Sequence, residues 1–411
     1  MKAYVEVYGC TLNFGESREI VDMLAEKGWD IVEDPEGSDL AVLVTCVVIE
    51  TTERAMLKRI AELSKAPKLV VTGCMATACR EKAQLVSPSA AFVAPGDLES
   101  FSRLIESYGS RKASKATKTD SYSIVPIATG CRGACSYCIT RLARGELRSR
   151  SPAKIIDSVK LAASSGPREI QLTAQDTAAY GCDIGANLPM MVGEVCKVPF
   201  DFRLRIGMMN PKSVLPILDP VAEMYLEPKV FKFLHLPLQS ASDELLKHME
   251  RGYSVDDYRS IIRRVRENVP LATVSTDLIV GYPGESEKDH RNNLSIISEL
   301  RPDIVNVTRF SSRPGTKAAE ADGPIVGWKA KDRSRELTAL RFKVALDRNR
   351  SWVDKEFVAL STEPGKSAST ILRSDEYKQV VVPESLPLGR YYRVKVVDAT
   401  PTYLIGARIG D

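Results

Sequence analysis

The sequence predicts an α/β protein in three parts: an N-terminal parallel α/β sheet domain, a central partial (β/α)6 barrel and a small C-terminal antiparallel β-barrel. The first two parts are indicated by short β-branched runs that alternate with helix-like segments. The third is indicated by a change beyond Asp354 to short strands separated by turn residues. A chain of 411 residues, 44% of them apolar, can bury more than one core.

The N-terminal domain, residues 1–108, opens with three expected strands separated by helix-like segments. These strands are Ala3–Tyr8, Leu40–Thr45 and Lys68–Thr72. Cys10, Cys46 and Cys74 each lie one or two residues beyond the end of one of them. Because ligands collect at the carboxyl ends of parallel strands, we expect the three thiols to converge. The alternative is that each is a buried apolar side chain, and Cys79 is the main rival ligand.

A polar stretch, residues 109–122, is expected to be a linker because GSRKASKATKTD contains no large apolar residue. The βα rhythm resumes over residues 123–350, the expected barrel. Its six strands are Ser123–Thr129, Glu169–Thr173, Phe202–Ile206, Val230–Leu236, Thr273–Val280 and Ile304–Arg309. The tail, residues 351–411, is too short for a sandwich. Its five strands are Phe357–Ser361, Thr370–Arg373, Gln379–Val382, Tyr391–Val397 and Thr402–Ala407.

Three cysteines directly after the first expected barrel strand carry the strongest chemical signal. Cys131, Cys135 and Cys138 are spaced C-x3-C-x2-C. Three thiolates leave one iron of a [4Fe–4S] cube without a protein ligand, and a substrate's amino and carboxylate groups can chelate that iron. A zinc site would need a fourth Cys or His, and residues 139–145 contain neither. We therefore predict a cluster with an open iron, with a structural zinc knuckle as the alternative.

Composition excludes several other classes. Nine cysteines in 411 residues are too few for a disulfide-stapled secreted domain, and an odd number cannot pair completely. We leave Cys182 and Cys196 as structural residues. No window approaches eighteen consecutive apolar residues, so a cytoplasmic protein without a membrane span is expected. A net charge of +4 does not by itself indicate nucleic acid.

The C-x3-C-x2-C segment closely resembles the signature of radical S-adenosylmethionine enzymes. With the N-terminal cysteines included, the chain resembles the methylthiotransferase family along nearly its whole length. The matching phrases are YGCTLN (8–13), VTC (44–46), TGCM (72–75), HLPLQS (235–240), MERGY (249–253), TDLIVGYPGE (276–285) and RPGT (313–316).

The resemblance implies two [4Fe–4S] clusters, one on each cysteine triplet, and S-adenosylmethionine as both methyl donor and radical source. All six cysteines are then metal ligands with catalytic roles. The N-terminal cluster would hold or relay sulfur, and the barrel cluster would generate the radical that activates C2 of a modified adenine. The tail looks like the family's TRAM domain, which helps to bind tRNA. The implied partners are a tRNA anticodon stem-loop and a low-potential ferredoxin- or flavodoxin-type electron donor, with an unidentified sulfur donor.

Two further segments are similar to the archaeal and eukaryotic subgroup, TRLARG (140–145) and RIGMMNP (205–211). That subgroup acts on N6-threonylcarbamoyladenosine at tRNA position 37. Arg132, Gly133 and Leu142 depart from the pattern around the signature, which weakens the substrate assignment but not the chemistry. The alternatives are methylthiolation of isopentenyladenosine in tRNA or of a ribosomal-protein aspartate, and, outside enzymes, a zinc-containing RNA-binding protein.

Polar residues near the expected strand ends are assigned to the cofactor or substrate pocket. Gln175 and Asp176 follow the second barrel strand, and Gln239 and Ser240 end the fourth. The alternative for these residues is helix or turn capping. The remaining members of the set are Asp277, Gly281 and Arg205.

Asp277 lies within the fifth strand, and Gly281 turns the chain where glycine permits close approach of the backbone to a ligand. Arg205 is a lone charge in a β-rich run, either an edge residue or an interior ligand contact, and burial would imply an anionic partner. His235, His248 and His290 are expected to be structural.

A basic segment, residues 329–350, is expected to be a helix that contacts phosphates, or else a solvated helix face. In the tail, Arg390 and Arg393 flank Tyr391 and Tyr392, and so combine cations with stacking surfaces for RNA.

Overall fold

The computed structural model describes residues 1–109, 122–164, 169–321 and 326–410. The expected linker, 109–122, lies almost entirely outside the described residues. Within the described chain there are two compact units. The first draws on Met1–Thr119, Ala128–Arg148 and Ser311–Glu320, and the second on Asp120–Ile127, Ser149–Phe310 and Ala321–Asp411. Both cysteine triplets therefore fall in the first unit.

The first unit is built on a parallel sheet whose strand order is β2-β1-β3-β4-β5. Its strands are β1 (Lys2–Val7), β2 (Asp30–Val32), β3 (Leu40–Thr45), β4 (Leu69–Gly73) and β5 (Ala91–Phe92). Every residue of β3 is buried, because the strand is central and helices cover both faces. The expected strands are confirmed to within a residue or so, whereas β2 and β5 are too short to have been predicted.

Alternation along β3 divides the core of this unit into two layers. Leu40, Val42 and Val44 face one layer and Ala41 and Leu43 the other. The helices of the first layer are α1 (Thr11–Glu26) and α5 (Leu98–Tyr108). Those of the second layer are α2 (Glu50–Leu63), α3 (Met75–Ala78), α4 (Arg80–Val86) and α6 (Ile139–Arg144).

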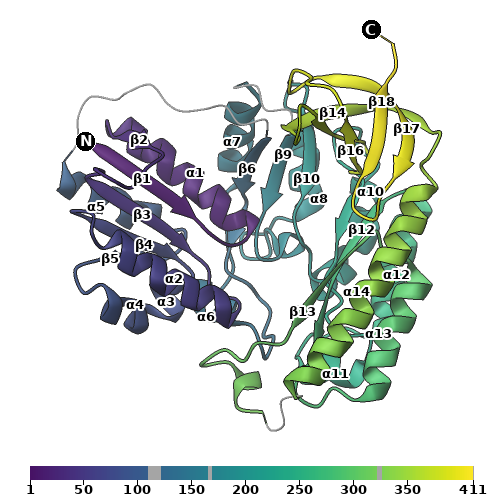
Figure 1. The fold of residues 1–411 in the computed structure, drawn as a ribbon, viewed down its shortest axis with the longest axis horizontal. Coiled ribbons are helices and arrows are strands. Elements are labelled where there is room, and N and C mark those ends of the chain that lie inside the picture. The colour runs from purple at the N-terminus through teal and green to yellow at the C-terminus, as the bar shows by residue number, and fades with distance from the viewer. Residues whose placement is uncertain (110–121, 165–168, 322–325, 411) are drawn as a thin grey trace. The chain divides into compact units, whose positions relative to one another are not determined.

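The second unit contains the expected barrel strands, with two three-stranded parallel sheets ordered β10-β9-β6 and β11-β12-β13 (Figure 1). The strands are β6 (Tyr122–Pro126), β9 (Glu169–Thr173), β10 (Arg203–Ile206), β11 (Phe233–His235), β12 (Thr273–Val280) and β13 (Ile304–Arg309). A parallel bridge between Leu204 and Val230 joins the two sheets. The strands therefore follow sequence order in a partial (β/α)6 barrel, as predicted.

Helices connect these strands. They are α7 (Pro152–Ser164), α8 (Leu188–Cys196), α9 (Pro211–Val214), α10 (Leu218–Met224), α11 (Asp243–His248), α12 (Val255–Asn268), α13 (Glu287–Leu300) and α14 (Gly327–Arg350). Short strands β7 (Ala128–Thr129) and β8 (Arg148–Ser149) flank the cysteine signature. Capping boxes at Ser254 and Ser286 define where α12 and α13 begin, since each serine and its carboxylate partner satisfy free backbone N–H groups.

Residues 356–408 form a closed five-stranded barrel ordered β14-β15-β16-β18-β17. Its strands are β14 (Glu356–Pro364), β15 (Thr370–Arg373), β16 (Gln379–Val382), β17 (Tyr391–Ala399) and β18 (Leu404–Arg408). All of its pairs are antiparallel except the parallel pair of β16 with β18. The small barrel was predicted correctly, but its one parallel pair was not.

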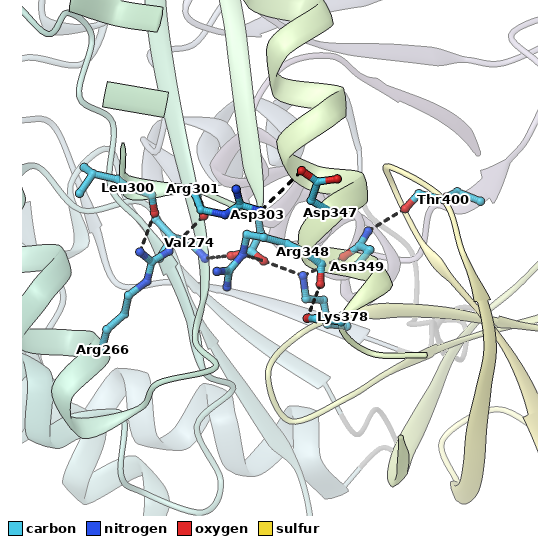
Figure 2. Close-up of polar contacts among 11 residues, drawn as sticks. Arg266, Val274, Leu300, Arg301, Asp303, Asp347, Arg348, Asn349, Lys378 and Thr400 are labelled. Carbon is cyan, nitrogen blue, oxygen red and sulfur yellow. Dashed lines mark hydrogen bonds and ion pairs between the residues drawn. The ribbon is translucent and has the colours of Figure 1, made fainter. Parts of the chain in front are cut away.

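A buried ionic network attaches this small barrel to β13 and α14 (Figure 2). Lys378, from the turn between β15 and β16, donates to Asp303 Oδ1 at 2.6 Å and to Asn349 Oδ1 at 2.9 Å. Arg348 of α14 donates to the same carboxylate oxygen at 2.6 Å. Burial opposes ionisation of Asp303, but the two cations outweigh it and hold the pKa of this carboxyl below its ordinary value.

Candidate functional site

Three thiols meet at the carboxyl edge of the N-terminal sheet. Cys10, Cys46 and Cys74 follow β1, β3 and β4, which are neighbours in the sheet. Burial raises the pKa of the Cys74 thiol to about 12, and the nearby Cys10 and Cys46 thiols shift it in the same direction. The predicted convergence is thereby confirmed, while their role as cluster ligands stays a prediction.

The peptide segments around these thiols are tied together by Asn13 of α1. Its Nδ2 donates to the carbonyl of Tyr8 at 2.6 Å and to that of Thr45 at 3.0 Å. It thus links the residues just before Cys10 and Cys46. Gly9 is required here because its φ is +116° and an added Cβ would lie 2.5 Å from Asn13 Nδ2. The sequence YGCTLN therefore encodes a compact turn, and Asn13 sets its shape.

Arg144, the last residue of α6, reaches this edge from the signature segment. Its side chain is fully buried. Its Nη1 lies 2.5 Å from Glu16 Oε1, and its Nη2 donates to Asn13 Oδ1 at 2.6 Å and to Glu16 Oε2 at 2.9 Å. Its positive charge also opposes the rise that burial causes in the pKa of the nearby Cys74 thiol. Its Nε is buried and has no partner among the described residues. One guanidinium thus joins the signature segment to the N-terminal thiols.

The signature loop is shaped by its own backbone and by Arg141. The Gly133 N–H donates to Cys131 Sγ at 3.2 Å, and Arg141 Nη1 donates to the carbonyls of Cys131 at 2.9 Å and Gly133 at 2.7 Å. Burial raises the pKa of the Cys138 thiol, whereas hydrogen bonds from Thr140 and Arg141 oppose that rise. The three cysteine residues of the loop are partly exposed as residues, but the Cys138 thiol itself is buried. The loop is therefore held in shape by its own hydrogen bonds at the edge of the unit.

The two thiol triplets lie on elements that share one core. Ile139 and Ala143 of α6 pack in the same cluster of buried side chains as Cys74 and Met75. A later segment also contacts the signature loop, because the Ala318 N–H donates to the Ser136 carbonyl at 2.8 Å. The fold thus brings together three segments that are far apart in the sequence.

Cys79, the rival ligand, points to a different set of groups. Its Sγ lies 3.8 Å from Glu53 Oε2, a carboxylate that also pairs with Lys82 at 2.6 Å and with the buried Arg313. Burial raises the pKa of the Cys79 thiol, followed by the Glu53 charge. The geometry therefore groups Cys74, and not Cys79, with Cys10 and Cys46.

Among the described residues, no three His, Cys, Asp or Glu side chains gather as they would around a single metal ion. A cube requires a wider spacing, because each thiolate binds a different iron.

The residues predicted at the barrel strand ends differ in how they are bonded. Asp176 is buried, accepts from Ser213 Oγ at 2.6 Å and from the Asn210 N–H at 3.0 Å, and so holds the loop after β10. Gln175 Oε1 and Ser240 Oγ are buried without a partner in the described chain. Gln239 adopts a φ of +73°, a conformation that costs about 1–3 kcal/mol and is common at ligand sites.

Asp277 and Arg205 lie in the barrel interior. Asp277 accepts from Asn306 Nδ2 at 2.7 Å and lies 3.0 Å from His235 Nε2. Arg205 donates to Gln171 at 2.8 Å. Gly281 has a φ of +80°, and an added Cβ would lie 2.9 Å from the Ala330 Cβ. Glycine is therefore needed at this turn for packing against α14, whatever binds there.

The basic helix is confirmed as α14, but only part of its charge faces solvent. Arg333 pairs with Glu285 at 3.0 Å, Arg341 donates to the Val305 carbonyl, and Arg348 joins the network around Asp303. The exposed cations are Lys329, Lys331, Arg335, Lys343 and Arg350. Arg333, Arg341 and Arg348, which the basic segment offered as possible phosphate contacts, thus bond to neighbouring parts of the second unit and help to hold the helix there.

Comparisons with known proteins agree with this geometry. Residues 2–94 match the family described as "Uncharacterized protein family UPF0004", and residues 125–295 match the "Radical SAM superfamily". The chain is 38% identical to a "Probable threonylcarbamoyladenosine tRNA methylthiotransferase" of Pyrococcus horikoshii, over 99% of each protein. The chain belongs to the methylthiotransferase family of radical S-adenosylmethionine enzymes. It is also 30% identical to the "Threonylcarbamoyladenosine tRNA methylthiotransferase" of Homo sapiens, covering 100% of this chain and 74% of that one. These relatives place this methylthiotransferase in the archaeal and eukaryotic subgroup.

A solved structure shows the same fold. The radical S-adenosylmethionine methyltransferase TsrM from Kitasatospora setae is similar with a TM-score of 0.57 at 15% identity, over 79% of this chain and 81% of that one. No helix in the described part of this methylthiotransferase is both long and apolar enough to cross a membrane.

Sequence reasoning missed Arg144, Glu16 and the Glu53–Arg313 pair. Arg144 entered the sequence analysis only as part of the segment TRLARG (140–145), with no role of its own. Glu16 carries no local signal, because its partner Arg144 is 128 residues away. A charged residue on an otherwise apolar helix face would have been the available clue. In this methylthiotransferase, the Arg144–Glu16 pair joins the signature segment to α1, and the Glu53–Arg313 pair joins α2 to the later segment that contacts the signature loop.

Proposed function

We propose that this chain installs a methylthio group at C2 of N6-threonylcarbamoyladenosine at tRNA position 37. The observation that carries the proposal is the presence of two cysteine triplets in one compact unit, joined through Arg144. Full-length relatives named threonylcarbamoyladenosine tRNA methylthiotransferase support the choice of nucleoside.

The cofactors are two [4Fe–4S] clusters and S-adenosylmethionine, and the residues fit them. Each triplet supplies three thiols, and a cube held by three thiolates would have one iron open to another ligand. The orphaned Arg144 Nε and the Gly133 N–H near Cys131 are donors of the kind that hydrogen-bond to cluster sulfur. The chemistry that these groups supply when bound is radical hydrogen abstraction and delivery of sulfur and a methyl group.

The remaining site residues bind and orient. We assign Gln175 and Ser240 to polar groups of S-adenosylmethionine or of the nucleoside, because each has a buried oxygen that still needs a partner. Gln239 and Gly281 shape the backbone at the strand ends, and Asp277 and Arg205 are interior contacts. Asp176 also lies in the proposed pocket, where it holds the loop after β10 through its hydrogen bonds to Asn210 and Ser213.

The proposed RNA partner is the anticodon stem-loop. The exposed cations of α14 and of the small barrel, with its neighbouring tyrosines, suit phosphate and base contacts. We further propose the domain limits 1–108, 123–350 and 351–411, a TRAM function for the last, cytoplasmic action, and a low-potential ferredoxin- or flavodoxin-type electron donor.

Anaerobic reconstitution followed by nucleoside mass spectrometry tests the function. The protein should convert tRNA carrying N6-threonylcarbamoyladenosine into its 2-methylthio form and should leave isopentenyladenosine tRNA unchanged. If product forms only from the isopentenyladenosine tRNA, the proposed function is wrong and the alternative, methylthiolation of isopentenyladenosine, is correct. Colourless, zinc-containing protein would refute an iron–sulfur enzyme.

Cysteine variants separate the two clusters. Alanine at Cys131, Cys135 and Cys138 should abolish 5′-deoxyadenosine formation and retain an N-terminal cluster detectable by Mössbauer spectroscopy. Alanine at the other triplet should retain cofactor cleavage and lose sulfur insertion. Cys182→Ala, at an exposed site outside both triplets, is the matched control and should behave as the native chain does.

A further inference from the structure

The second unit contains a large cavity whose ligand the assigned roles leave open, although Arg205 lines it. Its volume is about 570 Å³, within the range of about 300–1,000 Å³ typical of ligand pockets. Strands β11–β13, helix α14 and the small C-terminal barrel line it. Thr273 and Ile304, the first residues of β12 and β13, belong to the lining, so the cavity occupies the amino-terminal half of these strands. We call it the basal chamber.

The basal chamber is cationic and aromatic. Four cations line it, and Asp303 is the one carboxylate in the described lining. Lys378 is already used by Asp303, and Arg373 lies 3.3 Å from Glu363. Arg205 and Arg341 form no ion pair with any carboxylate among the described residues, so their charges are available to a ligand.

Only some of the guanidinium N–H groups of Arg205 and Arg341 form hydrogen bonds. Arg205 donates to Gln171, and Arg341 donates to the Val305 carbonyl. In both, Nε is buried and has no partner among the described residues, and the same holds for Oγ1 of Thr273, which is 2% exposed. Buried polar atoms of this kind normally have a partner. Three unsatisfied groups in one cavity therefore point to an oxyanion-bearing ligand.

Aromatic rings hold Arg205 in place. Its guanidinium lies 5.0 Å from the Phe233 ring centre and 5.4 Å from that of Tyr377, which itself bonds to the buried Glu169 at 2.8 Å. The two rings contact each other, with centroids 4.8 Å apart, and the guanidinium packs against both. A guanidinium held in this way loses little freedom on binding a carboxylate, and its planar fork matches carboxylate geometry. The chamber is thus preorganised for a planar oxyanion.

We propose that the basal chamber binds the carboxylate of the threonylcarbamoyl group on the target adenosine, with Arg205 and Arg341 as its partners. This inference rests on the proposed function. The C2–H and C6–N6 bonds of adenine lie on either side of N1 and point obliquely away from each other. A base whose C2 faces the carboxyl ends of the strands therefore directs its N6 substituent away from that end, toward the barrel wall and its lower half. An isopentenyl group offers no charge to these arginines, so the chamber would select the substrate.

The test compares binding of two anticodon stem-loops to the anaerobic holoenzyme by fluorescence anisotropy. One RNA carries N6-threonylcarbamoyladenosine and the other its threonyl methyl ester, which removes the charge and keeps the rest of the group. The native protein should prefer the acid by about tenfold to a hundredfold, the range expected of a hydrogen-bonded charge pair. Arg205→Gln and Arg341→Gln should each remove most of that preference.

The control is Arg335→Gln, on the same helix but 70% exposed; because Arg335 is one of the cations proposed to contact RNA phosphates, the change should affect both RNAs equally and retain the preference. Equal weakening of both RNAs by Arg205→Gln would mean that the chamber holds a backbone phosphate, and would overturn the carboxylate assignment. A native preference that neither variant changes would also overturn it. If the native enzyme forms methylthio product while this preference is absent, the chamber assignment fails and the proposed function stands. Cluster absorbance and circular dichroism show whether each variant is folded.

Discussion

Replacing Arg144 with Met should destabilise the first unit far more than loss of a surface arginine. Arg144 and Glu16 have side chains 0% and 5% exposed and are paired at 2.5 Å. Removing the guanidinium leaves a buried carboxylate without its counter-charge, which costs about 3–5 kcal/mol. At a urea m-value of about 1–3 kcal/mol/M, the unfolding midpoint should fall by roughly 2 M.

Tryptophan fluorescence can follow this unit alone. Trp29 is buried in its core, so in a Trp328→Phe, Trp352→Phe background it reports unfolding of the first unit. The matched control is Arg103→Met, because Arg103 and its partner Glu99 are 67% and 81% exposed and such a pair contributes about 0–1 kcal/mol.

Adding Glu16→Leu to Arg144→Met should restore part of the lost stability, since no buried charge is then left unpaired. The reasoning is refuted if Arg144→Met lowers the midpoint no more than Arg103→Met does.

Three other predictions concern the rest of the molecule. The pKa of Asp303 is held below its ordinary value, so its stabilising contribution is present above about pH 4 and is lost as the pH falls through the folded-state pKa. Asp303→Asn should therefore destabilise the protein at pH 7 and flatten its acid unfolding profile, whereas Asp332→Asn should not; identical profiles would contradict the buried network. Gly281→Ala should lower the melting temperature, because φ is +80° and its Cβ would clash with Ala330, while Gly284→Ala, with open space around it, should cost less. Cys79→Ser should retain the iron content that Cys74→Ser loses, as measured by elemental analysis; equal loss would make Cys79 a ligand.

Much of the fold could be predicted from local pattern. Strands β9, β12, β13, β15 and β16 were predicted residue for residue, because β-branched runs between turn residues have few other conformations available. Strands β2 and β5, of three and two residues, escaped prediction because so short a run carries no period.

By itself the sequence located the two cysteine triplets and predicted the iron–sulfur chemistry expected of them, because ligand type and spacing are local properties and strand ends place Cys10, Cys46 and Cys74 on one edge. Only the tertiary structure decided which charged groups are paired with one another. It separated Cys79 from Cys74 and paired Arg144 with Glu16. It also placed Arg348 and Lys378 on Asp303 and left Arg205 in a cavity without a carboxylate partner among the described residues. Partners of this kind are far apart in the chain, and the burial that makes their pairing strong exists only after folding.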